Sequence, residues 1–204
     1  MYHCHLQFYL TGYQNSIFEV IKKTAPLENF NHEFSENDEP DGALAAGADV
    51  ILANLQGMNA KEALYTLLGA KKKEADLILV LEKGQFAFEG PEAENALKEI
   101  RDIWTLPMSE AEVGFRFKKW QQEYKKKLDY WQESQYLEAT IDNIPSLIWY
   151  KDKNGVHEKV NDSFCKTVNK TRQQVQGQRH AYIWDVEQDD PACIESERIV
   201  MEKE

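Results

Sequence analysis

The sequence has too few cysteines for a disulfide framework or a structural metal cluster. Its three cysteines, Cys4, Cys165 and Cys193, lie far apart and form no C-x-x-C pair. An odd number of scattered thiols is typical of a reducing compartment. The stretch HCH near the start resembles a metal motif, but on a strand His3 and His5 share one face while Cys4 points to the other. We therefore expect ordinary strand side chains there and no metal.

Positive charge and long apolar runs are also scarce. The chain has 24 lysines and arginines against 35 acidic residues, a formal net charge of -11. Such a surface repels phosphate backbones and anionic lipids, so neither nucleic acid nor a membrane is expected as a partner. No apolar run approaches the roughly 20 residues of a bilayer span, and the first lysine is Lys22, so no signal peptide is predicted. We expect a cytoplasmic protein.

Five apolar strand candidates alternate with helical segments in the first half of the chain. They occupy residues 5–10, 30–34, 49–55, 76–81 and 102–106. Stretches such as VILANL and LILVL are apolar throughout, which indicates burial on both faces and parallel pairing through right-handed crossovers. We predict an α/β fold with a flavodoxin-like five-stranded parallel sheet. In such sheets ligands bind at the carboxyl ends of the strands.

The strand spacing and the segments DVILANLQGMNAKEAL and DIWTLPMSEAEV resemble the receiver domain of bacterial response regulators. The resemblance covers roughly residues 1 to 120. In that family an aspartate ending the third strand takes a phosphoryl group, and an acidic pair after the first strand holds Mg²⁺. A hydroxyl residue ends the fourth strand and a lysine ends the fifth. In this sequence Asn54 stands at the place of the phosphorylated aspartate, and Thr11 and Gly12 stand at the place of the acidic pair. Glu82 replaces the hydroxyl residue, and Leu106 replaces the lysine.

These replacements remove the chemistry that the resemblance implies. Phosphoryl transfer to a carboxylate needs a nucleophilic oxygen, a divalent cation and a positive group on the phosphate. Asn54 is a poor nucleophile, Thr11 and Gly12 carry no carboxylate, and Leu106 carries no charge. We predict a pseudo-receiver that does not use aspartyl phosphorylation. Its former site is either plain core or a site for a small molecule or partner.

A long helix is predicted after the last strand. Ser109 with Glu112 three residues later forms a capping box, and no proline follows until Pro145. A helix from Ser109 to Asn143 would be about 50 Å long.

Apolar residues form a stripe along this helix in steps of three and four. The first turns should pack on the sheet, but beyond about Trp120 no domain is left to cover the stripe. We therefore expect Tyr124, Leu128 and Trp131 to meet a second copy of the chain, with Leu137 and Ile141 as further candidates. The alternative is that the stripe folds back on its own domain. The KKK run at 125–127 is interpreted as a solvated helix face.

The last part of the chain predicts a hairpin followed by short helices. SLIWYKD and VHEKV flank the pair Asn154-Gly155, a strong hairpin signal. The pieces IPSLIWYKDKNG and VNDSFCK resemble the start of a PAS domain, with a match over roughly residues 138 to 204. The last three strands of that fold are missing, so we expect a partial α+β PAS domain belonging to a longer protein.

The PAS resemblance implies an apolar pocket that could hold a small-molecule ligand. Candidates for its lining are Trp149, Phe164, Ile183 and Trp184, although the same aromatics could be simple core. One histidine, His180, is not enough to indicate haem, and no flavin-adduct motif is recognisable. No cofactor is expected.

Together these features predict a receiver-like domain at 1–107, a dimerising helical linker at 108–143 and a partial PAS domain at 144–204. We interpret the chain as a non-catalytic regulatory region of a bacterial signalling protein, acting on a C-terminal output domain. In proteins of this layout the output is often a diguanylate cyclase, although no GGDEF motif occurs here. The alternatives are a docking scaffold, or an enzyme in which Glu82, Asn54 and His32 converge at the strand ends. Neither a P-loop nor a G-x-G-x-x-G motif supports an enzyme.

Overall fold

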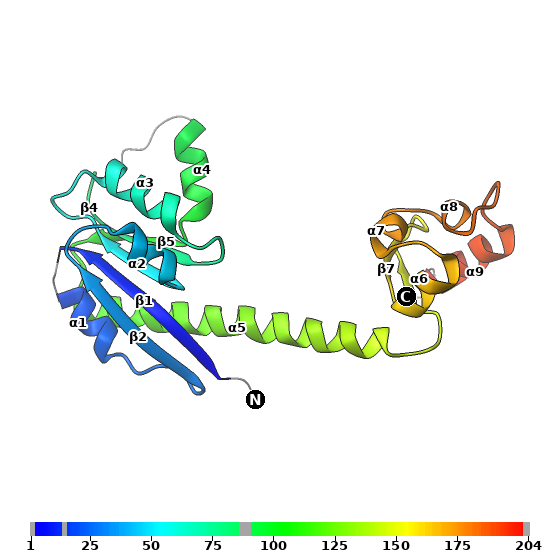
Figure 1. Cartoon of the computed structure of the whole chain (residues 1–204), viewed down its shortest axis with the longest axis horizontal. Coiled ribbons are helices and arrows are strands. Elements are labelled where there is room, and N and C mark those ends of the chain that lie inside the picture. Colours follow the sequence, from blue (N-terminus) through cyan, green and yellow to red (C-terminus); the bar gives the residue numbers. More distant parts are fainter. Residues whose placement is uncertain (1–2, 14–15, 86–90, 202–204) are drawn as a thin grey trace. The chain divides into compact units, whose positions relative to one another are not determined.

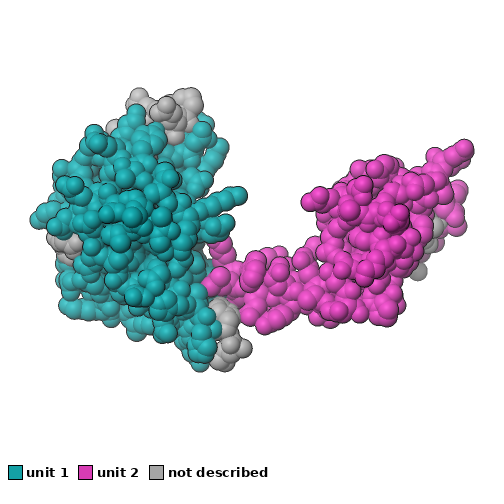
Figure 2. Space-filling view, viewed as in Figure 1, with its two compact units in different colours: residues 1–125 teal, residues 126–204 magenta. Residues whose placement is uncertain are grey.

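The computed structural model of the chain describes residues 3–13, 16–85 and 91–201. The chain divides into two compact units, residues 1–125 and 126–204, coloured separately in Figure 2. The boundary falls inside one long helix, α5 (Glu110–Asp142). The predicted boundaries near residues 107 and 143 therefore stay predictions, because compactness divides the chain elsewhere. None of the helices in the described ranges combines the length and apolarity of a membrane span.

Unit 1 is built on a sheet of five parallel strands in the order β2-β1-β3-β4-β5 (Figure 1). This confirms the predicted α/β fold, and each predicted strand has its counterpart. The strands are β1 (Cys4–Gly12), β2 (Phe30–Asn37), β3 (Val50–Asn54), β4 (Asp76–Glu82) and β5 (Asp102–Leu106). All five residues of β3 are buried, as expected for a strand covered on both faces.

Helices cover both faces of this sheet. On one face lie α1 (Ser16–Lys23) and the start of α5, and on the other lie α2 (Gly42–Gly47), α3 (Ala60–Ala70) and α4 (Pro91–Glu99) (Figure 1).

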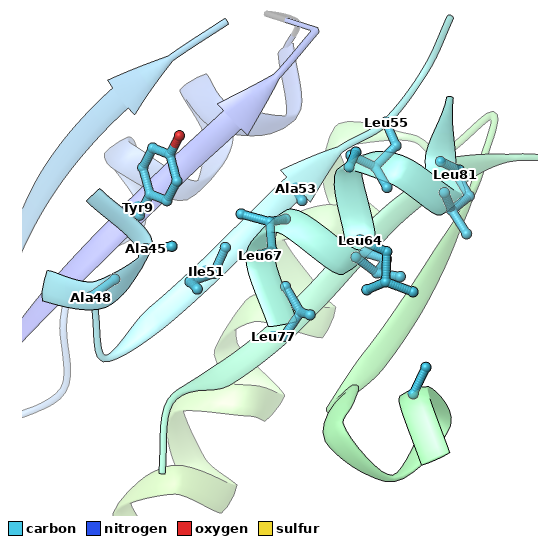
Figure 3. Packing of buried hydrophobic residues seen from close by; sticks show 14 residues of the cluster. Tyr9, Ala45, Ala48, Ile51, Ala53, Leu55, Leu64, Leu67, Leu77 and Leu81 are labelled. Atoms are coloured by element: carbon cyan, nitrogen blue, oxygen red, sulfur yellow. The ribbon is translucent and has the colours of Figure 1, made fainter. Parts of the chain in front are cut away.

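Strand alternation divides the unit 1 core between the two faces. Phe8 points toward α5, where its ring centroid lies 5.8 Å from that of Phe117 and 5.5 Å from that of Trp120. The next residue, Tyr9, belongs to the opposite layer, which also contains Leu64 of α3 (Figure 3). Both layers contain buried side chains, so unit 1 has a core of its own.

Unit 2 consists of the end of α5, a two-stranded antiparallel sheet and four short helices. Its other elements are β6 (Trp149–Lys151), β7 (His157–Val160), α6 (Asp162–Val168), α7 (Arg172–Val175), α8 (His180–Trp184) and α9 (Pro191–Met201). The predicted hairpin is present: Gly155 has φ +76°, and the Asp152 carboxylate accepts bonds from the backbone N–H groups of Asn154 and Val156. The predicted capping box of Thr171 and Gln174 is also present.

Asn161 connects three parts of unit 2. Its fully buried amide nitrogen donates to the carbonyls of Ile141, Ile144 and Ser146 at 2.9 to 3.2 Å. Its amide oxygen accepts from the backbone N–H of Ile148, before β6, and from that of Phe164, in α6. One side chain therefore bonds the end of α5, the approach to β6 and the first turn of α6.

Candidate functional site

The carboxyl edge of the unit 1 sheet holds the residues that the sequence singled out. The strand register pairs Gly12 of β1 with Asn54 of β3, and Glu82 of β4 with Leu106 of β5. Parallel strands end at one edge of a sheet, so positions distant in the sequence meet there. This edge is where a receiver-type site would lie.

Asn54 is buried, and its side-chain amide is engaged at both atoms. Its Nδ2 donates to the carbonyl of Tyr13 at 2.7 Å, and its Oδ1 accepts from the backbone N–H of Gln56 at 3.3 Å. The backbone carbonyl of Asn54 also accepts from the N–H of Tyr13 at 3.0 Å. The side chain thus fastens the β1 loop to the β3 loop.

Gly12 allows this close approach of the two strand ends. It has φ +96°, a conformation that L side chains rarely adopt, and an added Cβ would collide with the backbone oxygen of Asn54. A side chain at position 12 has no room while this contact persists.

The residues present do not fit a magnesium site. Mg²⁺ needs carboxylate ligands, but Gly12 has no side chain. Thr11 is buried, and its hydroxyl has no hydrogen-bond partner in the described part of the chain. Within the described ranges, no group of three or more histidine, cysteine or acidic side chains could hold a metal ion. Of the HCH stretch, His5 instead contacts the Glu33 carboxylate at 3.0 Å.

A third loop is joined to this edge by Gln85, which sequence reasoning missed. Its Nε2 donates to the carbonyl of Leu55 at 2.5 Å and to that of Met58 at 3.4 Å. Its Oε1 accepts from the backbone N–H of Glu82 at 2.9 Å. No motif marks a loop glutamine for this role, because the role depends on where two loops lie.

A shallow hollow of about 380 Å³ remains beside these loops. Its lining includes Ser16, Gln56, Glu82, Leu106 and Met108, and it contains no lysine, arginine or histidine among the described residues. The exposed carboxylate of Glu82 is the charged group in that lining. A phosphoryl group would meet repulsion there with no cation to offset it.

The prediction that His32 converges with Asn54 and Glu82, made for the enzyme alternative, is wrong. His32 of β2 lies opposite Leu6 of β1, whereas Asn54 lies opposite Gly12. Six residues of extended strand separate these positions by about 20 Å.

His32 is instead enclosed by aromatic rings. Its ring centroid lies 4.7 Å from that of Phe8 and 6.1 Å from that of Phe117. Both ring nitrogens are buried and have no hydrogen-bond partner in the described part of the chain. Burial lowers the pKa of His32 to about 4.

The predicted dimer residues of α5 differ in their surroundings. The ring of Tyr124 lies 5.2 Å from that of Trp120, and burial raises the pKa of Tyr124 to about 12. The packed part of the stripe therefore extends one turn beyond the point expected from the sequence. Leu128 is half-buried and Trp131 is 62% exposed, and both lie in unit 2.

The four residues proposed to line a PAS pocket form a cluster around Phe164. Phe164 and Ile183 are buried, whereas Trp149 and Trp184 are exposed, with ring centroids 5.7 and 6.0 Å from that of Phe164. His180 is half-buried, and its ring lies 5.8 Å from that of Trp184.

Comparisons with known proteins give structural neighbours alone. No protein-family model and no curated protein sequence matches the chain. Among solved structures, the receiver domain of AraT, a response regulator from Geobacillus stearothermophilus, matches with a TM-score of 0.45 and 16% identity. That match covers 60% of this chain and 98% of AraT's domain. NtrX from Brucella abortus matches with a TM-score of 0.40 and 16% identity, over 74% of this chain and 38% of its own. At these values neither neighbour informs the chemistry of the site.

Proposed function

We propose that the chain is a non-catalytic regulatory region of a bacterial signal-transduction protein, and that its receiver-like unit works without aspartyl phosphorylation. The order of the five parallel strands and the position of the candidate site at their carboxyl edge support the receiver-like assignment. The observation that carries the proposal is the bonding of Asn54, whose amide joins two loops instead of facing an open site.

The same bonds explain why phosphorylation is unfavourable in physical terms. A group added at position 54 would displace the carbonyl of Tyr13 and leave it without its bond. The hollow beside the β3 loop also carries the exposed carboxylate of Glu82, with Leu106 where a cation would be needed.

Phosphodonor labelling tests this part of the proposal. The chain is incubated with acetyl phosphate and Mg²⁺ beside an active receiver domain, and both are weighed by intact mass spectrometry. We expect the control to gain a phosphoryl group and this chain to gain none. Stoichiometric labelling of the wild-type chain would overturn the proposal.

The further steps of the proposal concern signal transfer. We propose that α5 carries a change from unit 1 to a PAS-like unit 2, able to take a small-molecule ligand, in a cytoplasmic protein. The continuity of α5 and the bonds of Asn161 to its end support a mechanical connection. We further propose that α5 forms a homodimer, with Trp131 at the contact, and that the output domain is a diguanylate cyclase.

Cyclic dinucleotide formation tests the output. The full reading frame is supplied with GTP and Mg²⁺, beside residues 1–204 alone. Product from the long form only, at a rate that changes when residues 1–125 are deleted, would support the proposal. A folded long form that yields no product would rule out the cyclase and favour a docking scaffold. A scaffold should retain a stable partner in a pull-down, and added ligand should not change the amount retained.

A further inference from the structure

Unit 2 contains a groove between the last turns of α5 and the β6–β7 hairpin. Its volume is about 440 Å³. Its apolar lining consists of Leu137, Ile141, Ile148, Tyr150 and Val160. A groove of this size with an apolar floor is an unusual surface to leave open to water.

The rim of this groove is acidic. Lys159 contacts Glu138 at 3.4 Å and Arg172 contacts Asp142 at 2.8 Å, so each cation already has an acidic partner. Glu158 adds a third carboxylate to the lining. The groove therefore favours an apolar surface that brings positive charge with it.

The α5 helix itself carries such a surface. At about 100° per residue, Lys127, Trp131 and Ser134 lie on the same helix face as Leu137 and Ile141. Trp131 is 62% exposed and Leu137 is 57% exposed. Lys126 and Lys127 lie about one turn before Trp131, toward the start of the helix, and both are exposed. The apolar surface thus runs from the groove to a basic segment.

We propose that a second copy of this chain covers the groove, with residues 126–142 of the two α5 helices packed antiparallel about a two-fold axis at Ser134. This deepens the homodimer of the proposed function and rests on it. In this register Trp131 lies opposite the partner's Leu137, and Lys127 lies opposite the partner's Ile141, one turn from the partner's Glu138. The small side chain of Ser134 lets the helices approach where they cross.

Charge decides between the two possible orientations. In a parallel pair Lys126 and Lys127 would face their own copies, and Glu138 would face Glu138. In the antiparallel pair the lysines meet Glu138 and Asp142 of the other copy. Exposed ion pairs contribute little affinity but do select register and orientation, so the tryptophan and the groove provide the binding.

Sedimentation of matched variants tests the contact. The full chain is compared with Trp131→Glu and with Tyr136→Glu, which changes an aromatic of similar exposure, 65%, on the opposite helix face. We expect Trp131→Glu to weaken dimerisation at least about 30-fold, as for an interface anchor, and Tyr136→Glu to leave it near wild type. A monomeric wild-type chain, or equal effects of both substitutions, would overturn the proposal.

Spin-label distances test the orientation. The three native cysteines of the full chain are first replaced by serine. A single cysteine is then introduced for the spin label, either by Glu133→Cys or by Thr140→Cys. In the antiparallel pair the two copies of residue 133 are offset by about 3 Å along the helix axis and those of residue 140 by about 18 Å; in a parallel pair neither is offset. We expect a longer distance at 140 than at 133.

Equal distances at the two positions would overturn the antiparallel arrangement while leaving the regulatory function standing. Phosphorylation of the chain would have the opposite effect, because it would remove the proposed function and leave the dimer.

Discussion

The two units of this chain keep their folds in different ways. Of the thirty-four buried hydrophobic residues in the described part, thirty lie in unit 1 and four in unit 2. Of the sixteen exposed large hydrophobic residues, twelve lie in unit 2. Unit 1 therefore has a core sufficient for its own stability, whereas unit 2 has a small core and much uncovered apolar surface.

The difference indicates what each unit depends on. In unit 1, burial of apolar side chains holds the sheet together. In unit 2, a two-stranded sheet is marginal by itself, so the bonds of Asn161 and a covering surface become important. The following substitutions test this difference between the units.

The largest effect is expected from Phe164→Ala in unit 2. The substitution removes the ring at the centre of a four-residue core and should cost about 3 to 5 kcal/mol. We expect the amides of unit 2 to lose hydrogen-exchange protection while those of unit 1 keep theirs. Phe117→Ala, the matched change in unit 1, should lower stability without unfolding that unit. Protected unit 2 amides in Phe164→Ala would contradict the contrast.

Asn161→Ala should have the next largest effect. It removes five hydrogen bonds, to three carbonyls and two N–H groups, although the carbonyls of Ile141 and Ile144 each keep one other bond. We expect a loss of about 3 kcal/mol from unit 2. Asn143→Ala is the control, because that exposed amide makes one bond, to the carbonyl of Ala139. Urea unfolding monitored in unit 2 should separate the variants, and equal midpoints would show that the Asn161 bonds contribute little.

Gly12→Ala tests the strand-end contact of unit 1. Positive φ and the collision with the Asn54 carbonyl should together cost about 2 to 3 kcal/mol. Gly57 also has positive φ, +72°, but nothing lies within 4 Å of its added Cβ, so Gly57→Ala should cost about 1 kcal/mol. Thermal melting compares the two, and a Gly12 variant no worse than the Gly57 variant would show that the close approach is not required.

The smallest expected effect is the pH dependence that His32 confers on unit 1. Its folded pKa of about 4 lies below the usual histidine pKa of about 6.5, so the unfolded chain binds the proton more readily. This contribution should destabilise unit 1 by about 2 kcal/mol between pH 7 and pH 5. His32→Phe should remove that slope. Urea midpoints at the two pH values measure it, and an unchanged slope would assign the pH dependence to other groups.

The sequence predicted the unit 1 sheet because the central strands β3 and β4 are apolar almost throughout and helical segments separate the strand candidates. The same reasoning located Asn54, Glu82 and Leu106, since parallel strands end at a common edge. It did not find Gln85, whose role depends on the path of two loops, and it misplaced His32, whose position depends on strand register. Asn161 carried a usable signal, because an asparagine immediately before a helix is a typical N-cap.

Asn161 also has a mechanical consequence for α5. The carbonyl of Ile141 lies in the last turn of α5, and that of Ile144 lies two residues beyond the end of the helix. Because one amide holds both and also holds the hairpin and α6, the helix end cannot turn about its axis independently of them. A torque along α5 would therefore either turn the hairpin and α6 together with the helix end or break the bonds of Asn161.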